Sequence, residues 1–317
     1  MSLAIEQPAI EAPAAKAKAR HTLISDYKEL FKVRVTLMVV ITAWAGFHVG
    51  SLRSGITSFN GSLFDTLLGV AMVSCGSSAL NQVLERRSDA KMRRTADRPL
   101  ATGRISLPHG LIVGMFAIVL GSLYLARATN PTTGLLTLLT AVSYVAVYTP
   151  LKRYTTLATF IGAFPGAMPP LIGWTAARGI IEWPAVALFA ILFVWQFPHF
   201  MAIAWLYRED YGRAGIRMLP VVEPDGWSTV SEALVYAILM IPVSLVPVLL
   251  HTAGYIYGAS ALVLGIVYLV YTIRFARITR APEAPSSRVY ARELLKASVL
   301  YLPLLLIIMM LNAKGGR

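Results

Sequence analysis

Charge and cysteine are both scarce in this sequence of 317 residues. Charged residues make up only 14% of the chain, against about 25% in an ordinary soluble domain. Hydrophobic residues make up 56%, and the mean hydropathy is +0.62. These values exclude a disordered or collagen-like chain and argue against a soluble globular fold. The single cysteine, Cys75, excludes an internal disulfide.

The sequence does contain long apolar runs. Several approach twenty residues, which is the length that a helix needs to cross a bilayer. The runs therefore predict an all-α, polytopic membrane protein. Nine transmembrane helices are expected at residues 33–52, 63–84, 107–126, 131–148, 156–175, 183–206, 228–250, 254–273 and 293–312.

Lysine and arginine are unevenly divided between the two sides of this nine-span arrangement. Twenty-four lie on the side of the N-terminus and five on the other side. Cytoplasmic connections collect basic residues, so we expect a cytoplasmic N-terminus and an outside C-terminus in the cytoplasmic (inner) membrane. The same rule accounts for the net charge of +13, so the expected partner is the lipid bilayer and not nucleic acid. Residues 1–24 are expected to form a disordered cytoplasmic tail before a single transmembrane domain over 25–317.

One polar segment follows the second span. Asn81, Glu85 and Asp89 are four residues apart, so on a helix their oxygens share a face. Carboxylate and amide oxygens suit Mg²⁺, which often keeps substrate phosphates among its ligands. The arginines of the same segment, which suit phosphate oxygens, are Arg93, Arg94 and Arg98. The segment is equally compatible with a diphosphate site and with a solvated loop laced with ion pairs.

A second polar segment follows the sixth span, on the same side of the membrane. It contains Glu209 and Asp210, so two acidic clusters could together hold two metal ions around one diphosphate. Within the preceding span lies His199, which is costly in an apolar environment unless it has a partner and is a functional candidate for that reason. The alternative is a structural imidazole bonded to a backbone carbonyl that Pro198 leaves free.

A third basic pair, Lys152 and Arg153, lies in the short connection between the fourth and fifth spans. The pair has two possible roles. It either anchors the chain at the cytoplasmic surface or reaches a diphosphate bound on that side.

Four motifs in order resemble the intramembrane aromatic prenyltransferase (UbiA) superfamily, and within it the branch that farnesylates protoheme IX. They are Asn-x-x-x-Glu-x-x-x-Asp-x-x-Met-x-Arg-Thr-x-x-Arg-Pro-Leu (81–100), Tyr-Thr-Pro-Leu-Lys-Arg (148–153), Gly-Ala-Met-Pro-Pro-Leu-Ile-Gly-Trp (166–174) and the run from Trp-Gln-Phe-Pro-His-Phe to Ala-Gly-Ile-x-Met-Leu-Pro (195–220). The likeness covers about residues 27–312.

The resemblance implies a helical bundle around a central cavity that is capped by the cytoplasmic loops. It implies a transferase that uses Mg²⁺ to join farnesyl diphosphate and protoheme IX, with addition of water, into heme O and diphosphate. Membrane proteins that use or modify heme downstream are possible partners. The implied site residues are catalytic Lys152, His199 and Asp210; diphosphate-binding Arg34, Arg94, Arg98, Lys152, Arg153 and Arg208; and metal-binding Asn81, Glu85, Asp89 and Asp210.

The sequence departs from the superfamily pattern in its second polar segment. Tyr207 and Tyr211 stand at the spacing of the usual paired acids. Two other classes of function remain open on the residues alone. One is a prenyltransferase for a quinone precursor or chlorophyllide, and the other is an ion-coupled transporter, although the acids here lie at the ends of the spans and no internal repeat is evident.

Overall fold

The computed structural model describes residues 21–315. Over these residues the chain is helical, as the sequence predicts, and the one β-type pairing is an isolated bridge between Ala253 and Ala313. The elements are α1 (Leu23–Leu30), α2 (Val33–Arg53), α3 (Gly61–Asp89), α4 (Pro99–Thr102), α5 (Leu107–Ala128), α6 (Pro131–Val142), the π-helix η1 (Ser143–Tyr148), α7 (Thr149–Leu151), α8 (Ala158–Arg178), α9 (Trp183–Leu206), α10 (Arg208–Ala214), α11 (Leu219–Val222), α12 (Trp227–Leu249), α13 (Tyr255–Phe275), the 3₁₀ helix η2 (Ala276–Arg280) and α14 (Pro285–Leu311).

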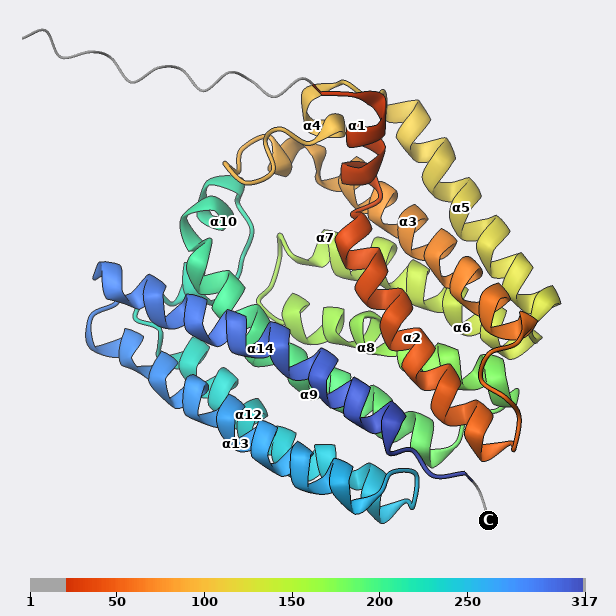
Figure 1. The fold of residues 1–317 in the computed structure, drawn as a ribbon. Helices are drawn as coiled ribbons and strands as arrows, with labels where there is room; N and C mark the ends of the chain where they lie inside the picture. The colour runs from red at the N-terminus through yellow and green to blue at the C-terminus, as the bar shows by residue number, and fades with distance from the viewer. Residues whose placement is uncertain (1–20, 316–317) are drawn as a thin grey trace, which may run out of the picture.

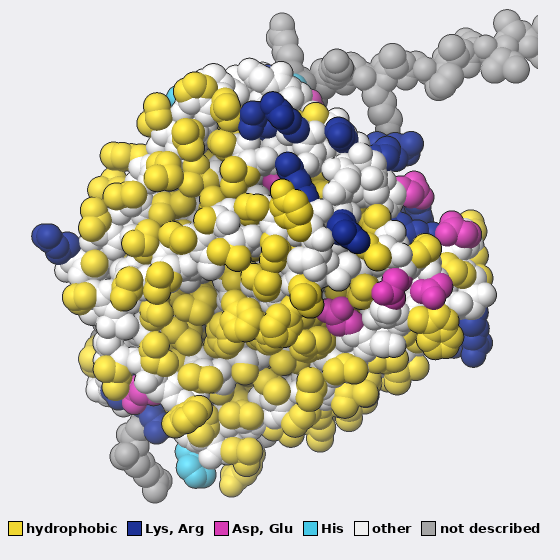
Figure 2. All heavy atoms as spheres, turned by 180° about the vertical axis from the view of Figure 1, so that it is seen from behind, with side chains coloured by type: hydrophobic (Ala, Val, Ile, Leu, Met, Phe, Trp, Pro, Cys, Tyr) yellow, Lys and Arg dark blue, Asp and Glu magenta, His cyan; other side chains and the backbone are white. Residues whose placement is uncertain are grey.

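The described part of the chain has eight helical segments that are long and apolar enough to cross a membrane. They correspond to eight of the predicted spans, so the protein is a multi-pass membrane protein. The remaining predicted span, 156–175, corresponds to α8, which has 21 residues but does not reach the same apolar content because it carries three prolines and several glycines. The count of nine therefore stays a prediction. On the face that Figure 2 shows, hydrophobic side chains cover the middle of the molecule and most basic side chains gather toward one end.

Several boundaries differ from the sequence-based expectation, among them two at the polar end of the bundle. The last helix begins at Pro285, eight residues before the apolar run, because Pro285 is well placed to open a helix and the added turns carry charged side chains. Of the tail predicted over 1–24, residues 1–20 lie outside the described part of the chain. The last part of this tail is ordered: Thr22 caps α1, and its side chain accepts a hydrogen bond from the Ser25 backbone.

The two ends of the bundle have different compositions. At one end lie α1, α4 and α10, together with the connection between α13 and α14 (Figure 1). At the other end Arg178 bonds to Ser54 at 2.8 Å, and Lys314 N–H bonds to the Thr252 carbonyl at 2.9 Å. The polar segments singled out in the sequence all lie at the first end.

Close backbone contact joins α2 to α8. A Cβ atom added at Gly173 would lie 1.8 Å from the Ala43 carbonyl oxygen, and one added at Gly46 would lie 1.9 Å from the Pro170 carbonyl oxygen. Small residues let helices in a membrane approach this closely. The remaining core is formed mainly by α9, α12, α13 and α14, with Trp174 and Trp205 fully buried in it.

Candidate active site

The candidate site is built on the last turns of α3. Asn81, Glu85 and Asp89 all belong to this helix, and each is at most 9% exposed. Each also accepts a hydrogen bond from a basic side chain of another segment. The pairs, in order along the helix, are Lys32 to Asn81 (2.6 Å), Lys152 to Glu85 (2.8 Å) and Arg98 to both oxygens of Asp89 (2.9 Å). The predicted single-face array is therefore one row of oxygens facing one row of cations.

Lys32 is a member of this site that sequence reasoning missed. Its backbone lies in the left-handed region (φ 45°, ψ 53°) between α1 and α2, which costs about 1–2 kcal/mol for a residue other than glycine. The hydrogen bond to Asn81 helps to offset that cost. Burial, together with the nearby charge of Arg98, lowers the pKa of Lys32 to about 7. In the sequence, Lys32 is a lysine directly before an apolar span, and that pattern indicates a membrane anchor and not a site residue.

Lys152 follows the π-helix η1 and the short α7. Its ammonium lies 4.3 Å from the centre of the Tyr148 ring in addition to its ion pair with Glu85. Burial alone would lower the pKa of Lys152, but Tyr148 and Glu85 outweigh burial and hold that pKa above its ordinary value. Thr149 strengthens the junction, because its hydroxyl accepts a hydrogen bond from the Asn81 amide at 3.1 Å. Lys152 is thus a fixed cation beside α3.

The second polar segment lies over the end of α3. Asp210 is buried, forms an ion pair with Arg213 and accepts the backbone N–H of Arg94 at 3.4 Å. The Arg94 guanidinium lies 4.6 Å from the centre of the Tyr207 ring and donates to the Tyr211 hydroxyl at 3.2 Å. The two tyrosines at the spacing of the usual acids therefore bind an arginine of the first loop.

Two further contacts bring the three sequence motifs together. The Arg217 N–H donates to the Lys152 carbonyl at 2.9 Å, which joins the second segment to the third. Met92 packs with Ala214 and Ile216 in a small apolar cluster between the two loops. These contacts place the three segments side by side at one end of the bundle.

Not every predicted diphosphate ligand points into this site. Arg34 is exposed near the start of α2. Arg153 is exposed and donates to the Ser88 hydroxyl at 3.0 Å, on the flank of α3. Arg208 packs on the Trp205 ring at 4.3 Å and pairs with Glu283 at 3.2 Å, so it is directed toward the α13–α14 connection. Three of the predicted cations do lie at the end of α3 or in the loops over it, namely Arg94, Arg98 and Lys152.

His199 lies deeper in the bundle, on α9. Its Nδ1 lies 2.8 Å from the Ser298 hydroxyl of α14, and its ring stacks on Trp195 with centres 4.8 Å apart. Its partner is therefore a side chain and not a backbone carbonyl freed by Pro198. The Ser298 hydroxyl also lies 2.7 Å from the Leu295 carbonyl and donates to it, an arrangement in which His199 Nδ1 is the donor in the hydrogen bond to Ser298. The second ring nitrogen, Nε2, then carries the lone pair.

The α3 array fits Mg²⁺ by the chemistry of its donors. Among residues 21–315 there is no group of three or more His, Cys, Asp and Glu side chains that could hold a metal ion by themselves. Mg²⁺ does not require one, because it is commonly held by one or two carboxylates together with substrate phosphates. Glu85 and Asp89 would supply those carboxylates, with the Asn81 amide oxygen beside them. Asp210 belongs to the loop above this array and is engaged by Arg213.

Comparison with protein families and curated proteins gives a consistent result. Residues 38–300 match the model of the UbiA prenyltransferase family. A protein from Koribacter versatilis named protoheme IX farnesyltransferase is 54% identical over 291 residues, which cover 92% of this chain and 94% of the relative. A protein of the same name from Salinibacter ruber is 43% identical and covers 92% and 99% of the two chains.

Solved structures share the fold at low sequence identity. A structure described as digeranylgeranylglyceryl phosphate synthase aligns with a TM-score of 0.72 at 18% identity, over 91% of this chain and 98% of the other. A UbiA homolog from Archaeoglobus fulgidus, bound to DMAPP and Mg²⁺, aligns with a TM-score of 0.59 at 16% identity, over 90% and 99%. These likenesses support the helical architecture described above.

Proposed function

Because the chain belongs to the UbiA prenyltransferase family, we propose that it transfers the farnesyl group of farnesyl diphosphate to a vinyl group of protoheme IX. Water adds in the same reaction, and the products are heme O and diphosphate. The relatives that carry this activity in their names span nearly the whole chain. The observation that carries the chemistry is the row of three cations facing three buried oxygen groups on α3.

The cations act on the leaving group. Breaking the allylic C–O bond of farnesyl diphosphate leaves a carbocation and puts the bonding electrons on the diphosphate. Lys32, Lys152 and Arg98 are already fixed by their contacts with α3, so they stabilise this charge without reorganising at the moment of reaction. Mg²⁺, held by Glu85 and Asp89 together with the diphosphate, would supply further positive charge there.

The acceptor step adds carbon and then water. The terminal vinyl carbon forms the new C–C bond with C1 of the farnesyl group, and the positive charge moves to the vinyl carbon next to the ring. A water oxygen bonds to that carbon and releases one proton. His199 Nε2 carries a lone pair in the tautomer that Ser298 selects, and we assign it as the acceptor of this proton.

The orientation belongs to the same proposal. The polar loops lie at the end of the bundle where most basic residues gather, and cytoplasmic connections collect basic residues. We therefore place the site at the cytoplasmic surface of the inner membrane, with the C-terminus outside. Heme O would then pass to membrane proteins that use or modify it.

A quinone precursor or chlorophyllide is not favoured as the acceptor, because the relatives named above carry the protoheme name. An ion-coupled transporter is not favoured either, since the buried acids lie at the end of α3 and pair with fixed cations.

Mass spectrometry of the heme product tests the function directly. The purified protein in nanodiscs is given protoheme, farnesyl diphosphate and Mg²⁺, and the extracted heme is expected to gain one farnesyl group and one water. Glu85→Gln and Asp89→Asn should lose this product, while Glu293→Gln, which removes a carboxylate paired with Arg274 away from the site, should retain it. Heme of unchanged mass from folded wild-type protein would refute the proposed reaction.

A further inference from the structure

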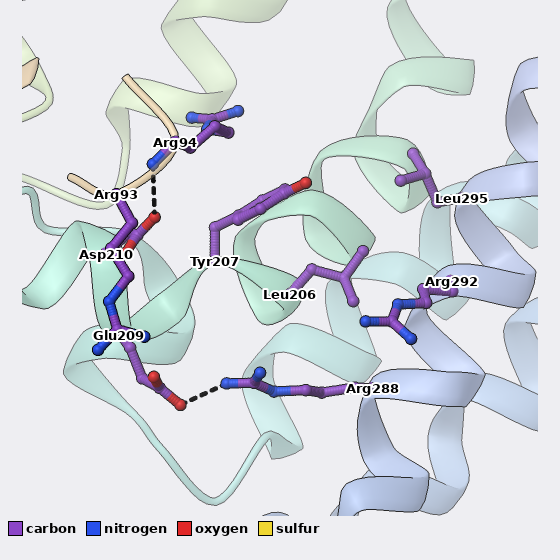
Figure 3. A pocket seen from close by; sticks show the side chains of 9 residues that line it. All are labelled: Arg93, Arg94, Leu206, Tyr207, Glu209, Asp210, Arg288, Arg292 and Leu295. Atoms are coloured by element: carbon purple, nitrogen blue, oxygen red, sulfur yellow. Dashed lines mark hydrogen bonds and ion pairs between the residues drawn. The ribbon is translucent and has the colours of Figure 1, made fainter. Parts of the chain in front are cut away.

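A pocket of about 450 Å³ lies beside the candidate site, between α10, α14 and the loop after α3. Figure 3 shows Arg288 and Arg292 reaching into it from α14, opposite Arg94 and Asp210. Its volume is that of an ordinary small-molecule site, for which the range is roughly 300–1,000 Å³. The contacts described for the diphosphate do not use α14, so the pocket is available for another part of the reaction.

The lining of this pocket suits a ligand with two negative charges and an apolar body. Four arginines face it against only two carboxylates, those of Glu209 and Asp210, so two positive charges are in excess. Asp210 is engaged by Arg213, and the ion pair between Glu209 and Arg288 is exposed, so an anion displaces it at little cost. Among residues 21–315 no carboxylate forms an ion pair with Arg292. The apolar side of the pocket is formed by Leu206, Tyr207 and Leu295.

The pocket is also linked to His199 through α14, since the pocket residue Leu295 accepts a hydrogen bond from the Ser298 hydroxyl. Ser298, which fixes the His199 ring, follows Arg292 by six residues on α14, or about 9 Å along a helix. That distance is comparable to the size of a porphyrin ring. Protoheme carries its two propionates on one half of the ring and its two vinyl groups on the opposite half. A porphyrin that lies along α14 with its propionates in the pocket would bring its vinyl half close to His199.

From these observations we infer that Arg288 and Arg292 bind the two propionate carboxylates of the porphyrin acceptor. The two arginines are one helical turn apart, so their side chains are neighbours and each takes one carboxylate. The inference rests on the proposed function for the identity of the acceptor. It assigns the porphyrin to α9, α10 and α14, whereas the diphosphate is assigned to Lys32, Lys152 and Arg98, which face α3.

The test compares protoheme with its dimethyl ester, in which both carboxylates are blocked. Binding to the purified protein in nanodiscs is followed by the change in heme absorption. Arg292→Gln and Arg288→Gln should each weaken protoheme binding by about tenfold, the effect of losing one hydrogen bond to a charged group, and should leave binding of the ester unchanged. Arg280→Gln, an exposed arginine at the same end that does not line the pocket, should affect neither ligand. The same two variants should raise the KM for protoheme and not the KM for farnesyl diphosphate.

Three outcomes would overturn the inference. One is that the arginine variants weaken the binding of protoheme and of the ester equally. Another is that they weaken the binding of neither. The third is altered retention of phosphatidylglycerol, compared with phosphatidylcholine, without any effect on protoheme, which would make the pocket a lipid headgroup site. If the wild type discriminates protoheme from its ester in the predicted way but makes no farnesylated heme, the proposed function fails and the propionate site stands.

Discussion

The three basic side chains that face α3 differ in how firmly their charge is held. Lys152 and Arg98 form ion pairs with buried carboxylates, and Tyr148 and Glu85 hold the pKa of Lys152 above its ordinary value against the effect of burial. Lys32 bonds to a neutral amide, and its pKa is lowered to about 7. Lys32 is thus the cation with most to gain from a bound diphosphate.

Replacing Lys32 with methionine removes this charge and keeps most of the side-chain length. We expect the KM for farnesyl diphosphate to rise about tenfold, as for loss of one charge-assisted hydrogen bond, with no change in the KM for protoheme. Lys28→Met, at an exposed position on α1, is the matched control. Steady-state kinetics with each substrate varied in turn give both constants, and a parallel rise in the two would contradict a diphosphate role.

His199→Asn separates the two nitrogens of the imidazole. The asparagine amide can still donate to Ser298 in place of Nδ1, but it has no group at the position of Nε2. We expect a melting temperature close to that of the wild type and loss of heme O formation. A variant that is stable and active would show that His199 serves only to join α9 to α14, whereas loss of stability in His199→Ala alone would be expected in either case.

Sequence reasoning found the ligands on α3 because a fixed spacing is visible in one dimension. It did not find Lys32. The role of Lys32 depends on its own left-handed backbone conformation between α1 and α2, which the sequence does not reveal. It also missed Arg288 and Arg292, which lie outside the apolar run used to place the last span. Conversely, Arg208 is an arginine like the site residues but pairs with Glu283 in the α13–α14 connection, and the direction of a side chain cannot be read from a motif.

At the contact between α2 and α8, a side chain added to a glycine meets backbone atoms at a shorter distance than at the other glycines of the described residues. The atoms that a methyl group at Gly173 would meet are backbone atoms of Ala43 and Phe47, which cannot move without separating the two helices. The apolar runs predict where helices lie, whereas this contact depends on which glycines of one helix meet the other.

Gly173→Ala should therefore destabilise the protein by about 1–3 kcal/mol, the usual cost of overpacking a core. Gly61→Ala is the control, because an added Cβ there meets nothing within 4 Å. Thermal unfolding in detergent compares the two variants. Equal melting temperatures would mean that α2 and α8 are less closely packed than described.

A carboxylate clamp holds α8 to the start of α9 at the opposite end of the bundle. Arg178 donates to both oxygens of Glu182, at 2.8 and 3.1 Å, and the Trp174 indole donates at 3.2 Å. The hydrogen bond from Arg178 lowers the pKa of Glu182 below its ordinary value of 4.5.

A lowered carboxyl pKa gives stability that is present above the ordinary value and is lost as the pH falls through the lowered one. Glu182→Gln should accordingly melt below the wild type at pH 7, and the gap should narrow progressively below pH 4.5. Melting curves recorded from pH 7 to acid provide the measurement. A difference in melting temperature that does not change with pH would show that the ion pair of Glu182 is not its cause.

The arrangement of the loops over the bundle makes a prediction about sidedness. Cysteines placed at the exposed positions Ala90 and Gly212, on a Cys75→Ser background, should resist an impermeant thiol reagent in intact cells and react in inverted vesicles. A cysteine at the exposed Thr57, in the connection between α2 and α3, should show the reverse pattern. Labelling of Ala90→Cys or Gly212→Cys from outside would overturn the cytoplasmic assignment.

The π-helix before Lys152 makes the site respond differently to a lost residue and to an added one. A π turn closes one residue later than an α turn, so the Ser143–Tyr148 segment carries an extra residue relative to a plain α-helix. Removing one residue there would let the segment revert to α-helix and leave the residues after it in the same register, so Lys152 would still face Glu85. An added residue is not absorbed in this way and would rotate everything after it by about 100°. Lys152 would then leave Glu85 although every site residue was still present.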